Sequence, residues 1–211
     1  MKISKFVFSP ISVNTYILTD ISGECVIIDC GCYDESEFSK LTGYLEKNNL
    51  KPVLLLNTHC HLDHIFGNGM MLNKYGLTTK ACRNEESNLQ NAPSHAMMFG
   101  LEMEEPPAIG EYIADNQIIP FGKSGLEALY VPGHSAGSIA YYSRDAGCVF
   151  TGDALFAGGI GRTDLPGGNY EQLITNIRTR LLTLSPDTVV YPGHGESSTI
   201  GIEIKTNRWL L

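Results

Sequence analysis

The stretch Thr58-His59-Cys60-His61-Leu62-Asp63-His64 follows closely on the apolar run Val53-Leu54-Leu55-Leu56. It places three imidazoles and one carboxylate within residues 59–64, which accounts for half of the six histidines in the chain. Neutral imidazole is the commonest metal ligand in proteins, and carboxylate is its usual oxygen partner. A polar surface turn is the alternative, but such a turn does not require this clustering. The stretch therefore predicts a metal-binding loop at the end of a buried strand, for one divalent cation or for two that share a cleft.

The composition excludes several classes of partner. The 211-residue chain has a net charge of −8, and its 15 lysines and arginines form no basic stripe, which argues against nucleic-acid binding. The first ten residues lack the apolar region of a signal peptide, and no later run approaches 18 apolar residues, so no membrane association is expected. We therefore expect a cytoplasmic protein. The sequence carries no signal for its oligomeric state.

The six cysteines predict reduced structural thiols. Most lie in apolar, strand-like runs, and they show neither a C-x-x-C pair nor the spacing of a disulfide framework. Cys60 lies inside the metal loop between two histidines. Alternation along an extended segment directs its thiol away from theirs, so we do not count it as a ligand.

The order of expected elements predicts the fold class. In the first half we expect strands at 6–8, 13–19, 24–29, 53–56 and 77–81, and helices at 34–48, 65–75 and 84–91. In the second half we expect strands at 117–120, 126–131, 139–143, 148–151 and 188–191, and helices at 169–184 and 199–211. This arrangement predicts an α/β fold, a four-layer αββα sandwich of two mixed β-sheets with helices on the outer faces. No linker interrupts the chain, so we expect a single domain over residues 1–211.

Residues 92–110 are expected to form a long excursion, because they contain three prolines and two glycines around a Met-rich centre. Half of the six methionines lie within 97–103. This segment is either a pliable apolar wall above the metal site or a connector that packs its Met and Phe side chains onto the core. His95, isolated within it, is expected at the surface.

Three further strands run into glycine-bearing turns that present one potential ligand each. They are Val131-Pro132-Gly133-His134, Phe150-Thr151-Gly152-Asp153 and Tyr191-Pro192-Gly193-His194. Such strand ends can converge in a sandwich, which would bring together seven ligands: His59, His61, Asp63, His64, His134, Asp153 and His194. Seven ligands are too many for one tetrahedral cation and suit two cations that share a carboxylate.

This set resembles that of the metallo-β-lactamase superfamily, and the resemblance runs from the first strand to the final helix. The H-x-H-x-D-H loop of the family corresponds to residues 59–64. The resemblance implies that the first metal is held by His59, His61 and His134, the second by Asp63, His64 and His194, and that Asp153 bridges them. It also implies a metal-bridging hydroxide as the nucleophile, with Asp63 essential to catalysis. The cofactors would be two divalent metal ions, most readily zinc, with iron or manganese as alternatives.

Within the superfamily, the segment Gly161-Arg162-Thr163-Asp164-Leu165-Pro166-Gly167-Gly168 resembles the glyoxalase II-like thioesterases. The resemblance implies hydrolysis of an acyl thioester such as S-lactoylglutathione, or of a related small thiol-derived substrate. A persulfide dioxygenase with a single iron, acting on glutathione persulfide, is the alternative, because that branch has a similar segment. Asp153 stands where one class of β-lactamases has cysteine, so antibiotic hydrolysis is not expected. We expect no added glutathione-binding helical domain within these 211 residues, which leaves the thiol carrier open.

Substrate contacts are expected from cationic side chains, since a carboxylate-bearing thioester requires a cation near the cleft. We single out Arg162 first, then Lys205 and Arg208. The alternative for each is a solvated side chain or a structural ion pair.

Overall fold

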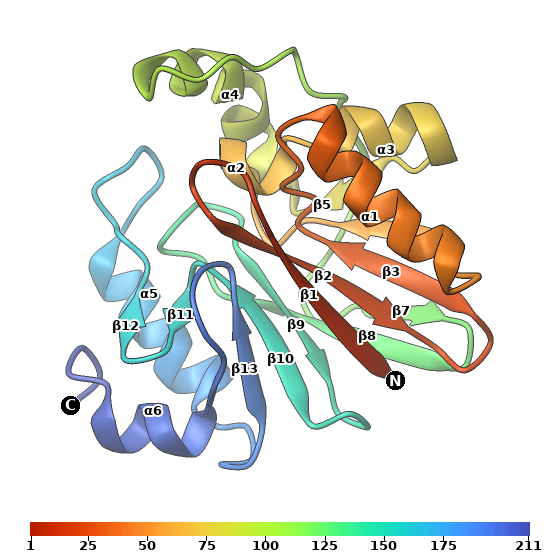
Figure 1. The fold of residues 1–211 in the computed structure, drawn as a ribbon. Coiled ribbons are helices and arrows are strands. Elements are labelled where there is room, and N and C mark those ends of the chain that lie inside the picture. The colour runs from red at the N-terminus through yellow and green to blue at the C-terminus, as the bar shows by residue number, and fades with distance from the viewer. The chain divides into compact units, whose positions relative to one another are not determined.

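The computed structural model describes residues 1–211, which group into two compact units. Unit 1 contains residues 1–112 and the hairpin tip 120–125, and unit 2 contains residues 113–119 and 126–211. Two six-stranded mixed sheets with helices are present, which confirms the expected fold class (Figure 1). The single domain expected for residues 1–211 stays a prediction. None of the helices combines the length and the apolar character that crossing a membrane demands.

The sheet of unit 1 has the strand order β1-β2-β3-β4-β5-β6. Its strands are β1 (Lys2–Phe8), β2 (Val13–Thr19), β3 (Glu24–Ile28), β4 (Lys51–Leu56), β5 (Thr79–Ala81) and β6 (Ile109–Tyr112). The pairs β1·β2 and β2·β3 are antiparallel, whereas β3, β4, β5 and β6 run parallel to one another. Because β3 and β4 are parallel neighbours, the residues that follow them leave the sheet at the same edge.

Helix α1 (Glu35–Lys47) covers one face of this sheet (Figure 1). Asp34 caps its first turn by accepting the Glu37 amide, and Phe38, Leu41 and Leu45 are buried at helical spacing. These side chains share one apolar cluster with strand residues of β2, β3 and β4. The helix therefore forms where its sequence predicted it.

The helix expected at 65–75 is divided into α2 (Leu62–Ile65) and α3 (Asn68–Tyr75). The division lies at Phe66 and Gly67. A Cβ at Gly67 would lie 2.5 Å from the Cys30 sulfur, so only glycine allows the turn after β3 to approach here. Tight packing against that turn, rather than helix propensity, explains the break.

The expectation for residues 92–110 is wrong in two places. Helix α4 (Glu86–Met98), which follows the 3-10 turn Arg83–Glu85, continues through Pro93, and residues 109–112 form β6. Buried Leu89, Ala92 and Ala96 keep the helical spacing across the proline and pack in the cluster that contains Leu62 of α2. Tertiary packing therefore outweighs the local cost of proline. Strand β6 escaped notice because three of its four residues are exposed.

The second sheet has the order β14-β13-β10-β9-β8-β7. Its strands are β7 (Ile118–Phe121), β8 (Ser124–Tyr130), β9 (Ile139–Ser143), β10 (Cys148–Gly152), β13 (Val189–Pro192) and β14 (Ser198–Thr199). β9 is antiparallel to both β8 and β10, and β10 is parallel to β13. The carboxyl ends of β8, β10 and β13 therefore lie at the same edge.

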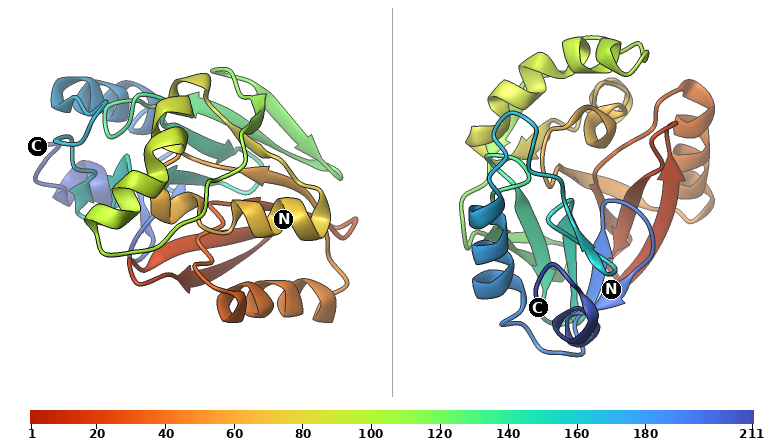
Figure 2. Two further views of the ribbon diagram at one scale, coloured as in Figure 1. Left: turned by 90° about the horizontal axis from the view of Figure 1, so that it is seen from above. Right: turned by 90° about the vertical axis from the view of Figure 1, so that its left-hand side faces the viewer.

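Helices α5 (Tyr170–Asn176) and α6 (Ile200–Thr206) pack with this sheet, and a π-helical turn (Ile177–Leu181) continues α5 (Figure 2). Leu173, Ile177 and Leu181 are buried against Val149 and Val190 of the sheet. The helix expected at 199–211 ends at Thr206 instead. The short hairpin strands β11 (Leu155–Phe156) and β12 (Gly159–Ile160) were not expected.

Candidate metal centre

The loop 58–64 follows β4 directly and ends in the short helix α2. His59 and His64 are buried, and the ring centroids of this pair lie 4.1 Å apart. His61 lies 4.6 Å from His59 by the same measure, with the two rings nearly perpendicular. The Nε2 atom of His64 is 3.6 Å from an Asp63 carboxylate oxygen. Unit 1 therefore gathers the loop's three imidazoles and carboxylate as the sequence predicted.

Asp29 orients this loop from the end of β3. Its Oδ1 accepts the Thr58 amide at 2.7 Å, and its Oδ2 accepts the Thr58 hydroxyl at 2.7 Å. Oδ2 is also 2.9 Å from Nδ1 of His64. Asp29 is 2% exposed and has a φ of +53°, a left-handed conformation that Asp tolerates better than most residues. The carboxylate thus joins two parallel strand ends.

These contacts assign the tautomers of two histidines. A carboxylate only accepts, so the proton of His64 lies on Nδ1, and Nε2 carries the lone pair. The Thr58 hydroxyl donates to Asp29, so its oxygen accepts from Nδ1 of His59 at 3.1 Å. In both rings Nε2 is thereby prepared as a metal ligand.

A buried amide network closes the loop on itself. The Asn57 side-chain amide donates to the His64 carbonyl at 2.8 Å, and its oxygen accepts from Asn68 at 2.9 Å. Asn68 also donates to the Thr79 hydroxyl at 2.9 Å. Asn57, just before the loop, therefore holds the last loop residue, His64, and is itself held by Asn68 of α3, which also contacts Thr79 of β5.

Cys60 faces away from the ligands, as predicted. It is fully buried in the apolar cluster formed by α2, α4 and β5, and all six cysteines of the chain are free thiols. Burial, with the carboxylates of Glu85 and Asp29 adding to it, raises the pKa of the Cys60 thiol well above its usual value. The thiol is therefore protonated and unsuited to bind a metal.

Unit 2 contributes three candidate ligands from three strand ends. Asp153 directly follows β10, His194 follows β13, and His134 lies four residues beyond β8. One oxygen of Asp153, Oδ2, is 3.7 Å from Nε2 of His134 and 3.7 Å from Nε2 of His194. The structure therefore brings this second set together as the sequence predicted.

The turn at residues 161–162 fixes His134. The carbonyl oxygen of Arg162 is 2.8 Å from Nδ1 of His134, and a carbonyl only accepts, so Nδ1 carries the proton and Nε2 the lone pair. A Cβ at Gly161 would lie 1.9 Å from the Asp153 carbonyl and 2.8 Å from Nδ1 of His134. Glycine is therefore required for the close approach between this turn and the two ligands.

Both sets suit a divalent cation. Two ligands about 2.1 Å from one tetrahedral cation lie about 3.4 Å apart, close to the 3.6 Å of unit 1 and the 3.7 Å of unit 2. These separations exceed a hydrogen bond. Imidazole nitrogens with carboxylate oxygens are the donors that zinc and iron accept. The residues therefore fit a metal in chemistry and spacing.

The residues expected to contact substrate are exposed. The guanidinium of Arg162 makes two hydrogen bonds with the Asp164 carboxylate, at 2.7 and 2.8 Å, and thereby lowers the pKa of Asp164 to about 2. Lys205 lies in the last turn of α6 and Arg208 follows that helix, and neither forms an ion pair. No hydrogen bond or ion pair joins either of them to the candidate ligands.

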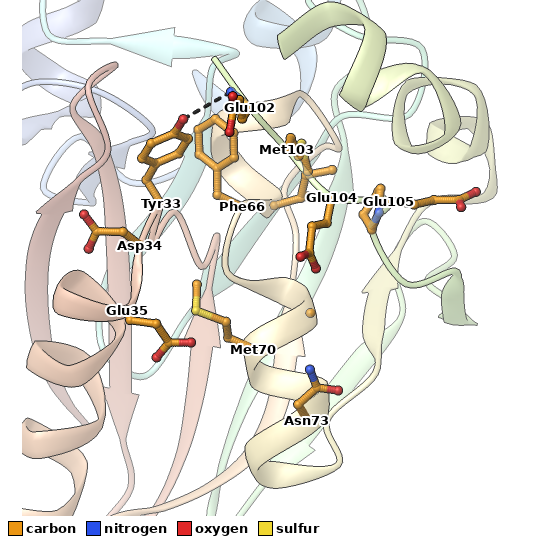
Figure 3. A pocket seen from close by; sticks show the side chains of 13 residues that line it. Tyr33, Asp34, Glu35, Phe66, Met70, Asn73, Glu102, Met103, Glu104 and Glu105 are labelled. Atoms are coloured by element: carbon orange, nitrogen blue, oxygen red, sulfur yellow. Dashed lines mark hydrogen bonds between the residues drawn. The ribbon is translucent and has the colours of Figure 1, made fainter. Parts of the chain in front are cut away.

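A cavity of about 690 Å³ lies in unit 1, next to α1, α3 and the segment 102–106 (Figure 3). Tyr33 and Phe66 pack edge to face on one side of it, and the Tyr33 hydroxyl accepts the Glu102 amide at 3.2 Å. None of the candidate ligands lines it. Met103 contributes to its wall, whereas residues 97–99 are exposed by 58–80%, so the interpretation that these three pack on the core is wrong.

Two carboxylates at the loop were missed by sequence reasoning. Asp29 was assigned only to a strand, and Glu85 only to a helix. A signal existed for Asp29, because it directly follows the apolar strand residues 26–28, much as the predicted ligands follow their strands. The hydrogen bond between Glu85 and the Cys60 amide has no comparable signal, because the two residues are 25 positions apart in the sequence.

A family model described as the Metallo-beta-lactamase superfamily matches residues 9–194. The chain therefore belongs to the metallo-β-lactamase superfamily, and the resemblance drawn from the sequence is confirmed. Both sets of candidate ligands fall within the matched residues.

The curated relatives include a probable metallo-hydrolase, a hydroxyacylglutathione hydrolase and a persulfide dioxygenase. The chain is 38% identical over 212 residues to the probable metallo-hydrolase YqgX of Bacillus subtilis, covering 100% of this chain and 98% of that protein. It is 35% identical to hydroxyacylglutathione hydrolase GloC of Haemophilus influenzae, over 93% of this chain and 92% of the relative. It is 31% identical to the human mitochondrial persulfide dioxygenase ETHE1, over 89% of this chain and 66% of that protein.

Two solved structures are similar over almost the whole chain. The BLEG-1 B3 metallo-beta-lactamase superposes with a TM-score of 0.90 at 30% identity, covering 99% of both chains. TTHA1623 in a di-iron-bound form superposes with a TM-score of 0.89 at 33% identity, covering 98% of this chain and 100% of that one.

Proposed function

We propose that this protein is a binuclear metal-dependent hydrolase that cleaves an acyl thioester such as S-lactoylglutathione. Hydrolysis breaks the bond between the acyl carbon and sulfur, leaving the hydroxyl of water on the carbon and a proton on the thiol. Divalent metals, when bound, supply an activated water and polarise the substrate carbonyl. The similarity to GloC, over nearly the full length of both chains, supports this substrate class.

One observation carries the proposal: Oδ2 of Asp153 is 3.7 Å from Nε2 of both His134 and His194. A single carboxylate oxygen between two imidazoles suits the role of a shared ligand. The seven proposed ligands are those predicted from the sequence: His59, His61, Asp63, His64, His134, Asp153 and His194. In this proposal the protein's own part is to hold His64, His59 and His134 with Nε2 presented, through Asp29, Thr58 and the Arg162 carbonyl respectively.

A mononuclear-iron persulfide dioxygenase is the second candidate, favoured by the 31% identity to human ETHE1. The metal content of protein purified without added metal separates the two. About two zinc, iron or manganese ions per chain, together with hydrolysis of S-lactoylglutathione, would support the hydrolase. One iron per chain with oxygen consumption on glutathione persulfide would overturn it. A penicillin in the same assay tests for β-lactamase activity, which the name of BLEG-1 gives for that protein. We expect no hydrolysis of the penicillin.

The Asp63→Ala variant tests the two-metal mechanism directly. We expect loss of about half of the bound metal and of thioester hydrolysis, because Asp63 is proposed as a ligand of the second metal. Asp145→Ala is the matched control, since Asp145 is exposed in a turn of unit 2. Unchanged hydrolysis in Asp63→Ala would show that the two-metal mechanism is wrong.

Arg162, Lys205 and Arg208 are proposed to bind a carboxylate of the substrate. Lys205 and Arg208 form no ion pair and can accept one, whereas Arg162 must first exchange Asp164. Replacing a binding cation by alanine should raise KM and leave kcat nearly unchanged. Arg144→Ala, at an exposed cation elsewhere in unit 2, is the control.

A further inference from the structure

Glu85 is a fully buried carboxylate that contacts the backbone of the metal loop. It ends the 3-10 turn that precedes α4, and its Oε2 accepts the Cys60 amide at 2.8 Å and the Asn88 side-chain amide at 2.9 Å. Burial shields this hydrogen bond from competition by water. The Cys60 amide is therefore firmly held.

The Cys60 amide occupies a sensitive position, because it lies between His59 and His61. Its direction fixes the peptide plane that joins His59 to Cys60, and this plane limits where the His59 imidazole and, through Cys60, the His61 imidazole start. Thr58, which directly precedes His59, is held by Asp29 from the end of β3. The short segment that carries two ligands is thus fixed by buried carboxylates from two different elements.

We propose that Glu85 is a positioning residue of the metal centre, which sets the relative orientation of His59 and His61 through the Cys60 amide. This inference rests on the proposed function, because it requires a metal at the loop. The role depends on reach rather than on charge. A group that keeps the acceptor at the same place should preserve it, and a carboxylate that is too short should not.

Unit 2 offers a closely matched control. Glu203 is also fully buried, and its Oε2 accepts one backbone amide, that of Gly158 at 2.9 Å, and one asparagine side chain, that of Asn207 at 2.8 Å. Its other oxygen accepts the Ser198 hydroxyl, and its amide partner, unlike that of Glu85, does not lie between candidate ligands. A general effect of disturbing a buried glutamate will therefore be visible in Glu203 variants.

The test compares Glu85→Gln, Glu85→Asp and Glu203→Asp with the wild type. Zinc affinity is measured by competition with a chelator, and ligand geometry by the visible absorption of the cobalt-substituted protein. Glutamine keeps an acceptor at the same reach, whereas aspartate keeps the charge but withdraws it by about 1.5 Å. We expect Glu85→Asp to weaken zinc binding by about 10- to 100-fold and to alter the cobalt spectrum. Glu85→Gln and Glu203→Asp should stay close to the wild type in both measurements.

Two outcomes would overturn the inference. Equal zinc affinity in Glu85→Asp and Glu203→Asp would show that Glu85 has only a structural role. Weakened zinc binding in Glu85→Gln together with wild-type zinc binding in Glu85→Asp would show that the charge of the acceptor, not its position, matters. A wild-type protein that binds neither zinc nor cobalt would instead refute the proposed function, so the two failures are distinguishable.

Discussion

Replacing Asp29 by asparagine should weaken metal binding without unfolding the protein. Asparagine has nearly the same shape, but one of its two terminal atoms donates instead of accepting. If the nitrogen takes the place of Oδ2, it faces Nδ1 of His64, which must then give up its proton and move it to Nε2, the ligand atom. If the nitrogen takes the place of Oδ1, the Thr58 amide loses its acceptor.

Each orientation has a comparable cost. An unsatisfied buried donor costs about 1–3 kcal/mol. Disturbing a group that orients a metal ligand typically costs 10- to 100-fold in affinity, which corresponds to about 1.4–2.8 kcal/mol. We therefore expect the zinc dissociation constant of Asp29→Asn to rise by about 10- to 100-fold. The metal-free variant should lose about 1–3 kcal/mol of unfolding free energy, since both orientations leave a buried group poorly paired.

The assay is chelator competition for zinc, accompanied by urea unfolding of the metal-free protein. Asp34→Asn is the matched control, because Asp34 is exposed and accepts only the Glu37 amide at the start of α1. Asparagine caps helices as well as aspartate, so this variant should retain both zinc affinity and stability. Wild-type zinc affinity in Asp29→Asn would refute the assigned orientation of the loop.

Three further outcomes follow from single side chains. In Gly161→Ala the new Cβ would overlap the Asp153 carbonyl, so zinc affinity, measured by chelator competition, should fall at least tenfold. In the control Gly159→Ala the new Cβ meets only Phe156, at 3.8 Å, and zinc affinity should not fall. Hydrogen bonds from two serines lower the pKa of Asp20 below its ordinary 3.8, so its stabilising effect is present above that pH and is lost as pH falls. Asp20→Asn should therefore destabilise the protein in urea at pH 7, by an amount that shrinks below pH 3.8. Burial raises the pKa of the Cys25 thiol to about 12, which disfavours its reactive thiolate at pH 8. Iodoacetamide at pH 8 should therefore label Cys82, the least buried cysteine, before any other cysteine, and mass spectrometry measures the order of labelling.

The ligands could be predicted from the sequence because each one follows an apolar strand. His134, Asp153 and His194 are each preceded by a strand and a glycine-bearing turn, and the structure places all three beyond strand ends. Their common edge follows from β10 pairing in parallel with β13, which no local pattern in the sequence specifies. Local chemistry thus revealed the candidates, and only the order of the strands brought them together.

Helix α4 shows where local reasoning failed. Pro93 and the Met-rich run indicated a loop, yet the helix extends to Met98 because Leu89, Ala92 and Ala96 continue to bury one face. Proline lacks one hydrogen bond, but the apolar contacts on either side of it remain. A helical spacing that continues across a proline is therefore stronger evidence than the proline itself.

The positioning roles of these carboxylates were not recognised from the sequence, because they depend on partners distant in sequence. Asp29 and Asp34 are five residues apart and chemically identical, yet Asp29 is buried against a loop 29 residues away, whereas Asp34 is exposed and caps the adjacent helix. Glu85 and Glu203 each accept a backbone amide and an asparagine side chain, and it is the identity of the backbone amide that relates Glu85 to the metal loop. A carboxylate that holds a metal-ligand loop and a carboxylate that holds any other loop both accept a backbone amide. They differ in whether the residues next to that amide are metal ligands. That difference becomes visible only once the chain is folded, and for Glu85 the accepted amide is that of Cys60, with His59 before it and His61 after it.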